Sequence, residues 1–230
     1  MKKVGIICAL NQEMAPFLNV IKKQTVVKKA RLDFIEGEMD GVPVVAVVCG
    51  IGKVNAAIAV QGMIEYFSPD CIIMSGTAGG MDNALKICDV VVCTAALYHD
   101  AEAGYLSESY PFILDGILHM DKKLVEIAKR SADKLGQKVC FGLTVSGDKF
   151  IDINGRGEIV SAFNPLCVDC ETAAAAHVCH IYDVPFLAVR SVSDTEEQHG
   201  VEVFRQYLDE AASKAFEVVR GIVSELIKSV

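Results

Sequence analysis

Short apolar runs rich in β-branched residues alternate along this chain with longer amphipathic stretches. The runs at residues 44–48 and 90–92 are apolar at every position, which is typical of strands covered by helices on both faces of a sheet. Asp40-Gly41 lies between two further runs and predicts a hairpin, so the sheet is expected to be mixed. The alternation predicts an α/β fold, a three-layer αβα sandwich around a twisted mixed β-sheet.

The length and period of the apolar patterns define the expected elements. Predicted strands span residues 4–10, 32–38, 42–49, 71–76, 89–97, 140–146, 166–170 and 186–192. Predicted helices span residues 12–23, 53–67, 121–135, 171–182 and 203–228. No Pro/Ser-rich linker, internal repeat or low-complexity tract interrupts this order, so residues 1–230 are predicted to form a single domain.

The composition argues against several kinds of partner. The formal net charge is -8, and the one short basic cluster, at residues 28–31, is interpreted as a solvated turn, so nucleic acid is not expected. No apolar run approaches the ~20 residues that span a bilayer, so no membrane contact is expected. Polar Asn11-Gln12-Glu13 interrupts the first apolar run, and no small-residue cleavage site follows. We therefore expect a first strand rather than a signal peptide, and a cytoplasmic protein.

Nine cysteines are scattered through the chain, mostly within apolar segments, and are predicted to be free thiols in a reducing compartment. Cys167 and Cys170 have the C-x-x-C spacing of zinc sites, and His177, Cys179 and His180 follow them. However, a strand would point the two cysteines to opposite faces, and the histidines fall in an alanine-rich helical stretch. The favoured interpretation is that the protein binds no metal.

Glycines follow two of the predicted strands, in the segments 50–53 and 77–80. The first segment resembles the end of a phosphate-binding P-loop, but Val54 stands where Ser or Thr binds magnesium, and Val47 where the first glycine belongs. No G-x-G-x-x-G follows the first strand, which disfavours a dinucleotide-binding fold. Two explanations for the glycines stay open: close approach of the backbone to a ligand, or simple strand termination.

Three acidic residues, Glu13, Glu171 and Asp194, stand where predicted strands end. Each has an ordinary explanation, because carboxylates are favoured in first helical turns and at N-caps. However, the carboxyl ends of the strands are also where ligands bind in sheets of this kind. Carboxylates gathered there suit proton transfer and the stabilisation of a cationic transition state.

Further motifs accompany these residues in a fixed order along nearly the whole chain. They are Val4-Gly5-Ile6-Ile7…Glu13-Met14, Gly50-Ile51-Gly52-Lys53-Val54-Asn55-Ala56-Ala57, Ser75-Gly76-Thr77-Ala78-Gly79-Gly80, Tyr98-His99-Asp100, Val145-Ser146-Gly147-Asp148-Lys149-Phe150-Ile151, Glu171…Ala176-His177-Val178-Cys179 and Val189-Arg190-Ser191-Val192-Ser193-Asp194. The ordered set resembles the methylthioadenosine/S-adenosylhomocysteine nucleosidases, a family of the purine nucleoside phosphorylase superfamily. The resemblance implies a homodimer that hydrolyses a purine nucleoside, with no metal and no organic cofactor.

The resemblance also implies a role for each polar site residue. Asp194, steadied by Ser193, is expected to act as the general acid that donates a proton toward the purine N7. Glu171 is expected to bind the ribose hydroxyls and stabilise the oxocarbenium-like charge on the sugar. Glu13 is expected to activate the attacking water, with Arg190 close to that water.

Other positions match the substrate-binding residues of the family. Phe150 is expected to stack on adenine, and the Ile151 backbone to hydrogen-bond to the edge of the base. The segment Thr77, Ala78 and Gly79 is expected to form a wall near the ribose. The sugar and its 5′ substituent are expected to be lined by Leu10, Ile51 and Phe204, with the partner subunit completing the 5′ pocket.

The chain departs from the family pattern at four places. It has Asp169-Cys170-Glu171 where the family commonly has Glu-Met-Glu, so Cys170 is expected to leave extra room or to make a different contact beneath the ribose. Position 77 is Thr where Ser is usual, which keeps the hydroxyl. The loop 101–117 lacks the usual apolar run and is a few residues shorter, and Glu196 and Glu197 follow Asp194 where small residues are expected. These changes concern the 5′ group more than the cleavage of the glycosidic bond.

Three functions are compatible with this sequence. The favoured one is hydrolysis of 5′-methylthioadenosine, S-adenosylhomocysteine or a relative such as 5′-deoxyadenosine. A phosphorylase of the same superfamily would use phosphate as its nucleophile, but Glu13 lies where that class needs a positive charge. A non-catalytic nucleoside-binding protein on the same scaffold is the third alternative.

Overall fold

The structure is a computed structural model that describes residues 3–102, 104–110, 112–136 and 138–228. Its strands are β1 (Val4–Cys8), β2 (Lys22–Lys29), β3 (Leu32–Met39), β4 (Val42–Val48), β5 (Cys71–Gly80), β6 (Val90–Tyr98), β7 (Leu118–His119), β8 (Val139–Ser146), β9 (Cys167–Asp169) and β10 (Phe186–Asp194). Its helices are α1 (Asn11–Leu18), α2 (Lys53–Phe67), α3 (Lys122–Leu135), α4 (Ile153–Phe163), α5 (Thr172–Ile181) and α6 (Val201–Lys228).

The strands of the described residues form one mixed sheet in the order β10-β6-β8-β9-β5-β1-β4-β3-β2, and β7 pairs with β6. β1 is parallel to β4 and to β5, and β5 is parallel to β10. β10 also pairs antiparallel with β6, so β5, β10, β6, β8 and β9 close into a ring. Because β1, β4, β5 and β10 run in one direction, their carboxyl ends meet at the same edge of the sheet.

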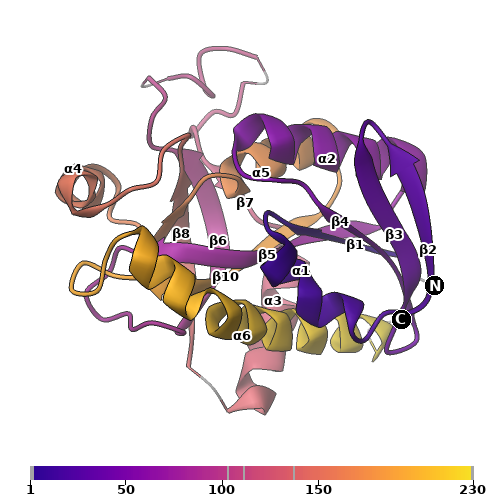
Figure 1. Cartoon of the computed structure of the whole chain (residues 1–230). Helices are drawn as coiled ribbons and strands as arrows, with labels where there is room; N and C mark the ends of the chain where they lie inside the picture. The colour runs from indigo at the N-terminus through magenta and orange to yellow at the C-terminus, as the bar shows by residue number, and fades with distance from the viewer. Residues whose placement is uncertain (1–2, 103, 111, 137, 229–230) are drawn as a thin grey trace.

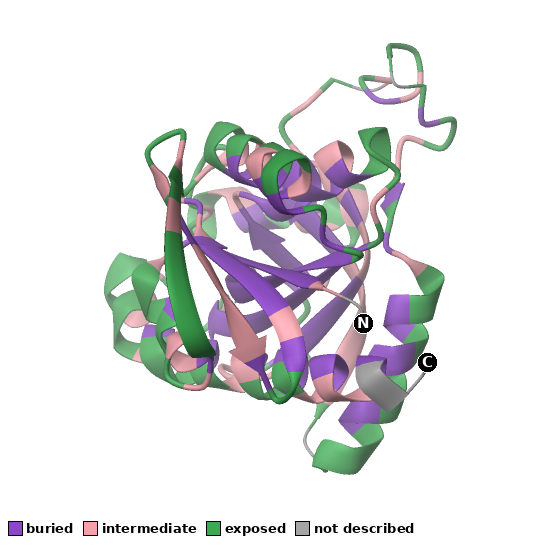
Figure 2. Cartoon of the chain, turned by 90° about the vertical axis from the view of Figure 1, so that its right-hand side faces the viewer, coloured by how far each residue is buried: buried purple, intermediate pink, exposed green. Residues whose placement is uncertain are grey.

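Helices cover both faces of this sheet. α2 and α5 pack together on one face, and α1 and α3 pack against α6 on the other (Figure 1). β1 and β10 are buried along their whole length, and Figure 2 shows the buried residues gathered in the sheet and on the inner faces of the helices. The predicted α/β fold with a mixed sheet between helices is confirmed. That the whole chain is one domain stays a prediction.

The predicted helix at residues 12–23 is wrong in its second half. α1 ends at Leu18, and the chain turns into β2, which forms the exposed edge of the sheet (Figure 2). β2 has mostly exposed side chains and no alternation of apolar and polar residues, so the pattern that predicts strands is missing from it. The basic cluster at residues 28–31 spans the end of β2 and the following turn, not a turn alone. Its lysines are typical of an edge strand protected from further pairing.

Two more elements lie where no element is predicted. α4 begins after Asp152, whose side chain accepts the Ile153 N–H at 2.8 Å as an N-cap. Its first turns contain Gly155 and Gly157, which lower helix propensity and hide the helix in the sequence. β7 has only two residues, too few for a periodic signal.

The hairpin predicted at Asp40-Gly41 is confirmed. The two residues join the antiparallel strands β3 and β4, with φ angles of 51° and 86°. Two consecutive positive φ angles are typical of the tight turn whose twist matches the flanking strands.

Cys8, Cys93 and Cys167 are free thiols buried among apolar side chains of the core. In the part of the chain that the structure describes, no helix has both the length and the apolar character needed to cross a membrane.

Candidate active site

Glu13 is a buried residue in the first turn of α1, next to the carboxyl end of β1. Its Oε2 accepts the N–H groups of Ala9 and Leu10, both at 3.0 Å, and the second bond satisfies the backbone N–H of the residue that precedes α1. Its Oε1 accepts the N–H and the hydroxyl of Thr77, both at 2.8 Å. The capping explanation therefore holds for one oxygen of this carboxylate, while the other is fixed against the end of β5.

Gly76 on β5 allows Glu13 to meet Arg190 of β10. A Cβ at Gly76 would lie 2.5 Å from Arg190 Nη1 and 2.7 Å from Glu13 Oε1, so any side chain there would push both groups away. Arg190 is fully buried, and its Nη1 has no hydrogen-bond partner among the described residues. The guanidinium thus keeps donors available beside the Glu13 carboxylate.

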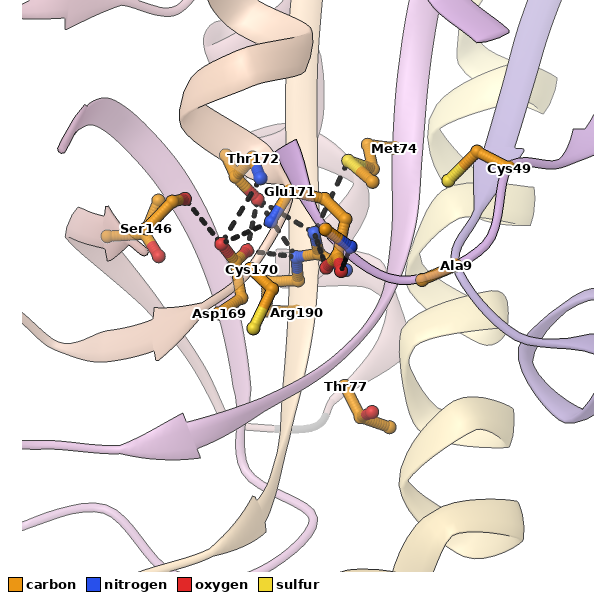
Figure 3. Close-up of polar contacts among 12 residues, drawn as sticks. Ala9, Cys49, Met74, Thr77, Ser146, Asp169, Cys170, Glu171, Thr172 and Arg190 are labelled. Carbon is orange, nitrogen blue, oxygen red and sulfur yellow. Dashed lines mark hydrogen bonds and ion pairs between the residues drawn. The ribbon is translucent and has the colours of Figure 1, made fainter. Parts of the chain in front are cut away.

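Arg190 also lies at the centre of an ionic cluster with Asp169 and Glu171 (Figure 3). Its Nε is 2.8 Å from Asp169 Oδ2, and its Nη2 is 3.8 Å from Glu171 Oε2. Asp169 also accepts the hydroxyls of Ser146 and Thr172. The N–H groups of Glu171 and Thr172 lie 3.2 and 3.1 Å from Asp169 Oδ1, so Asp169 caps α5. The Glu171 side chain makes no capping hydrogen bond, so capping does not account for it.

The Glu171 carboxylate lies between α5 and the loop before α2. Its Oε1 accepts the Gly52 N–H at 2.8 Å, and the side chain is buried. Burial, followed by the nearby negative charge of Asp169, raises the pKa of Glu171 to about 7, although Arg190 opposes the shift. The same loop carries Ile51, which is 60% exposed and lies at the edge of the site.

Asp194 is the last residue of β10 and is buried. The Ser193 hydroxyl is 2.9 Å from its Oδ1 and 3.2 Å from the carbonyl oxygen of Ala78, while Arg156 Nη2 forms an ion pair with its Oδ2. Burial raises the pKa of Asp194 and outweighs the opposing effect of Arg156. Because the next helix, α6, begins only at Val201, the N-cap explanation for Asp194 is wrong.

The end of β5 connects these groups to one another. Thr77 holds Glu13, and a Cβ at Gly79 would lie 3.2 Å from Asp194 Oδ2. Two residues of a strand span about 7 Å, so Glu13 and Asp194 lie at opposite ends of one short backbone segment. In this segment the glycines make room for side chains of the protein itself.

A small pocket opens beside Asp194. Phe150, at its edge, packs edge-on against Phe204 of α6, with ring centroids 6.1 Å apart. The residues that line the pocket come from four separate segments of the chain and are Gly79, Lys149, Phe150, Ile151, Val168, Asp169, Cys170 and Asp194. The structure thus brings the expected base-binding residues to the expected acid.

Two further predicted residues lie beside the carboxylates through their backbone or their loop. Leu10 contributes its N–H to Glu13, and Ile51 lies in the loop whose Gly52 binds Glu171. No hydrogen bond or ion pair among the described residues joins Glu13, Glu171 and Asp194 directly to one another. Arg190, Thr77 and the end of β5 connect them instead.

Sequence reasoning missed three residues of this site. Ser146 and Thr172 hold Asp169. Ser146 belongs to the motif at residues 145–151 and Thr172 directly follows Glu171, so their position was a usable signal. Arg156 lies between two glycines in a segment of low helix propensity, and no pattern there indicates a buried cation.

The two cysteines of the C-x-x-C spacing have different surroundings. Cys167 is buried in β9, whereas Cys170 lines the pocket, and burial raises the pKa of its thiol to about 12. Across the described ranges, no group of three His, Cys, Asp or Glu side chains is placed to hold a metal ion.

Comparisons with known proteins agree with this geometry. Residues 3–224 match the family model of the phosphorylase superfamily. The chain is 38% identical over 229 residues to the 5′-methylthioadenosine/S-adenosylhomocysteine nucleosidase of Actinobacillus succinogenes, covering 97% of this chain and 99% of the relative. The crystal structure of such a nucleosidase from Neisseria meningitidis, in complex with methylthio-immucillin-A, has a TM-score of 0.90 and 35% identity, covering 100% of both chains. Futalosine hydrolase of Helicobacter pylori has a TM-score of 0.88 and 26% identity, covering 97% of this chain and 98% of that chain.

The mixed sheet between two helix layers, with carboxylates at the strand ends, defines a protein of the phosphorylase superfamily. Within this superfamily, the chain belongs to the 5′-methylthioadenosine/S-adenosylhomocysteine nucleosidase family, and the predicted family is confirmed.

Proposed function

We propose that this protein hydrolyses the N-glycosidic bond of 5′-substituted adenosines such as 5′-methylthioadenosine and S-adenosylhomocysteine, releasing adenine and the ribose derivative. It is an enzyme of the N-ribosyl hydrolase class. Such a reaction adds water at C1′ and breaks the bond to the base, so it needs a base at one end of the substrate and an acid at the other. The observation that carries the proposal is the placement of Glu13 and Asp194 at opposite ends of the segment 76–79.

Asp194 is the general acid. Its raised pKa favours the protonated carboxyl that a proton donor needs, and the Ser193 hydroxyl orients it. Transfer of this proton to N7 makes the purine a neutral leaving group as the glycosidic bond breaks. The pocket of Phe150 and Ile151 holds the base beside it.

Glu171 stabilises the charge that forms on the sugar. As the bond to the base breaks, the ribose takes on oxocarbenium character, and a buried carboxylate nearby lowers the energy of that cation. The Gly52 N–H and Arg190 fix the carboxylate in place, so it does not need to reorganise during the reaction. Its other task is to accept hydrogen bonds from the ribose hydroxyls.

Glu13 and Arg190 orient the attacking water. All four lone-pair sites of the Glu13 carboxylate already accept hydrogen bonds, two of them from Thr77. A water held by the unpartnered Arg190 Nη1 therefore passes its proton to Glu13 by displacing the Thr77 hydroxyl or through it. The oxygen of the water then bonds to C1′, and the proton remains on the glutamate.

Water is favoured over phosphate because the site has no spare positive charge at the nucleophile end. Arg190 is the cation beside Glu13, and Asp169, Glu171 and Glu13 surround it, so their negative charges balance it and raise its pKa despite burial. A phosphate dianion in this place would face a carboxylate at close range. A non-catalytic nucleoside-binding protein would have no use for the buried acid and base.

The second part of the proposal is a homodimer in which the partner subunit completes the 5′ pocket. α2, α5 and the loop between β6 and β7 expose large apolar side chains, among them Val54 (70% exposed), Tyr105 (52%) and Ile181 (46%). Figure 1 shows this loop standing away from the body of the molecule, where a second subunit can reach it. Ala103 and Pro111 of the loop lie outside the described residues. Contiguous apolar surface of this kind is typical of subunit interfaces.

A reducing compartment suits the buried free thiols Cys8, Cys93 and Cys167, and we place the protein in the cytoplasm on that ground. The proposed reaction uses no metal and no organic cofactor.

The test is release of free base from purified protein. Methylthioadenosine, S-adenosylhomocysteine, 5′-deoxyadenosine, adenosine and inosine are incubated with the protein, with and without phosphate, and the base is measured by chromatography. We expect adenine release without phosphate. Strict phosphate dependence would instead identify a phosphorylase, and no release from any nucleoside would identify a binding protein.

The role of Asp194 is tested in the same assay. We expect Asp194→Asn to remove nearly all turnover on adenine nucleosides, because the amide has no acidic proton to donate. Asp33→Asn, at an exposed surface carboxylate, is the matched control. Retention of most of the wild-type rate by Asp194→Asn would contradict the assigned role.

A further inference from the structure

Arg156 of α4 reaches the buried carboxyl of Asp194 from behind the base pocket. The residue is only 3% exposed, and its Nη2 pairs with Asp194 Oδ2 while its Nη1 donates to the Gly80 carbonyl. Ile159, one turn later on α4, packs with Val145 and Val168 in a small hydrophobic cluster that anchors the helix. The position of Arg156 is therefore fixed by packing of its own helix.

An ordinary structural role does not account well for this ion pair. Arg156 Nε has no hydrogen-bond partner among the described residues, so the guanidinium is buried with part of its donors unused. A buried ion pair with incomplete hydrogen bonding adds little stability, because removing both charges from water costs as much as their attraction returns. Gly79 also leaves room for the pair, since a Cβ there would lie 3.2 Å from Asp194 Oδ2 and 3.3 Å from Arg156 Nη2.

We propose that Arg156 is a positioning residue for the general acid: it fixes the Asp194 carboxyl and stabilises the carboxylate that remains after the proton has moved to the purine. This inference rests on the proposed function. Arg156 contacts the Asp194 carboxyl, and its effect on the reaction passes through that group.

The chemistry of the acid explains why such a cation is useful. When Asp194 gives its proton to N7, a bare carboxylate is left in a buried site, which is costly without a partner. Arg156 at Oδ2 and the Ser193 hydroxyl at Oδ1 together satisfy both oxygens of that carboxylate. A preorganised cation therefore stabilises the transition state in which the proton is passing to the base.

Few other charges act on Asp194. Asp152, the N-cap of α4, is close enough to raise the pKa of Asp194, and His199 lies 2.9 Å from Asp152. Asp169 lines the same pocket, but Arg190 neutralises it at 2.8 Å. Arg156 is thus the main source of positive charge for Asp194 in the part of the chain that the structure describes.

The expected effects concern the dependence of the rate on pH. Because Asp194 must be protonated to act as the acid, the rate is expected to fall as the pH rises through its pKa, and this fall is the alkaline limb of the pH–rate profile. Loss of the cation in Arg156→Met is expected to raise the pKa of Asp194, so the alkaline limb moves to higher pH by about 1 unit. Because Asp194 is then a weaker acid, kcat is expected to fall by roughly tenfold. Arg156→Lys keeps the charge, so its limb is expected within about 0.3 units of the wild type. KM for methylthioadenosine is expected to change little in either variant.

The experiment measures kcat and KM from pH 5 to 10 for wild type, Arg156→Met, Arg156→Gln and Arg156→Lys. Arg156→Gln keeps a donor of similar reach without the charge, so it decides the question if Arg156→Met does not fold. Asp194→Asn shows which limb belongs to the acid, because that limb disappears from its residual rate. Arg220→Met, which removes an exposed ion pair with Asp40, is the matched control and keeps the wild-type profile.

Three outcomes separate the possibilities. A limb that moves in Met and Gln but stays in Lys supports the inference. An unchanged limb in both neutral variants, with lower thermal stability, overturns it and leaves Arg156 a structural residue. If the wild type itself releases no base, the proposed function fails, and that result is visible before any variant is measured.

Discussion

Replacing Glu171 with glutamine removes a negative charge that the fold buries at a cost. The pKa of this carboxyl is raised from an ordinary value of 4.5 to about 7, mainly by burial and then by the charge of Asp169. Below pH 4.5 the residue is protonated in both the folded and the unfolded protein, so its pKa shift costs nothing there. Between pH 4.5 and 7 the unfolded chain ionises and the folded protein does not, so the wild-type protein loses stability as the pH rises.

The size of this effect follows from the shift. About 2.5 pKa units correspond to roughly 3 kcal/mol of wild-type stability lost by pH 8. Glutamine keeps an oxygen for the Gly52 N–H but withdraws one carboxylate from Arg190, which offsets part of the gain. We therefore expect Glu171→Gln to be more stable than wild type at pH 8 by about 1–2 kcal/mol, or roughly 2–8 °C in Tm for a chain of this size.

Thermal unfolding at pH 5 and at pH 8, followed by circular dichroism, measures this difference. The gain of Glu171→Gln is expected to be small at pH 5 and to grow toward pH 8, while the variant loses hydrolysis at both. Glu158→Gln, which changes an exposed carboxylate on α4, is the control and is expected to follow wild type. A Tm difference that is equal at the two pH values would refute the raised pKa of Glu171.

Three further changes test the site. Gly76→Ala inserts a methyl group 2.5 Å from Arg190 Nη1, so kcat/KM should fall by about 100-fold or more, whereas Gly157→Ala, which meets nothing within 4 Å, should leave it unchanged. Thr77→Val removes a hydroxyl that donates to Glu13 and should lower both kcat and stability, the latter by about 1–2 kcal/mol, while Thr77→Ser should restore both. Val54→Asp places a charge on the apolar face of α2 and should shift the protein from dimer to monomer in sedimentation velocity; an unchanged dimer would exclude that face as the interface.

The parts of the fold that the sequence predicts are those with a strong apolar signal. β4 and the first half of β6 are apolar on both faces because helices cover both sides of them, and their patterns are unambiguous. β2 is an exposed edge strand stabilised by backbone pairing with β3, and backbone pairing leaves no trace in side-chain periodicity. α4 is held by the Asp152 cap and by burial of Ile159, which outweigh its two glycines.

The sequence predicts which carboxylates gather at the site, but it does not indicate their hydrogen-bond partners or the buried Arg156. Strand ends locate Glu13, Glu171 and Asp194 at one edge of the sheet, and the order of the motifs supplies their expected roles. Hydrogen-bond partners depend on side-chain geometry that spacing does not encode. Asp169 caps α5 although Glu171 stands closer to the helix start, because the shorter side chain reaches the N–H groups of its own turn.

Two arginines divide the charge of the site between its two ends. Arg190 balances the charges of Asp169 and Glu171 where the attacking water is expected to bind. Arg156 balances the charge of Asp194 where the purine is expected to bind, and the backbone of β5 lies between the two arginines. Because each cation contacts its own carboxylates, a change at one end should leave the titration of the other nearly unaltered. Removal of Arg156 should therefore move the alkaline limb of the rate profile and spare the acidic limb, which depends on the ionisation of Glu171. If both limbs moved together, Asp194 and Glu171 would be electrostatically coupled through the site. The assignment of one limb to Asp194 and the other to Glu171 would then have to be abandoned.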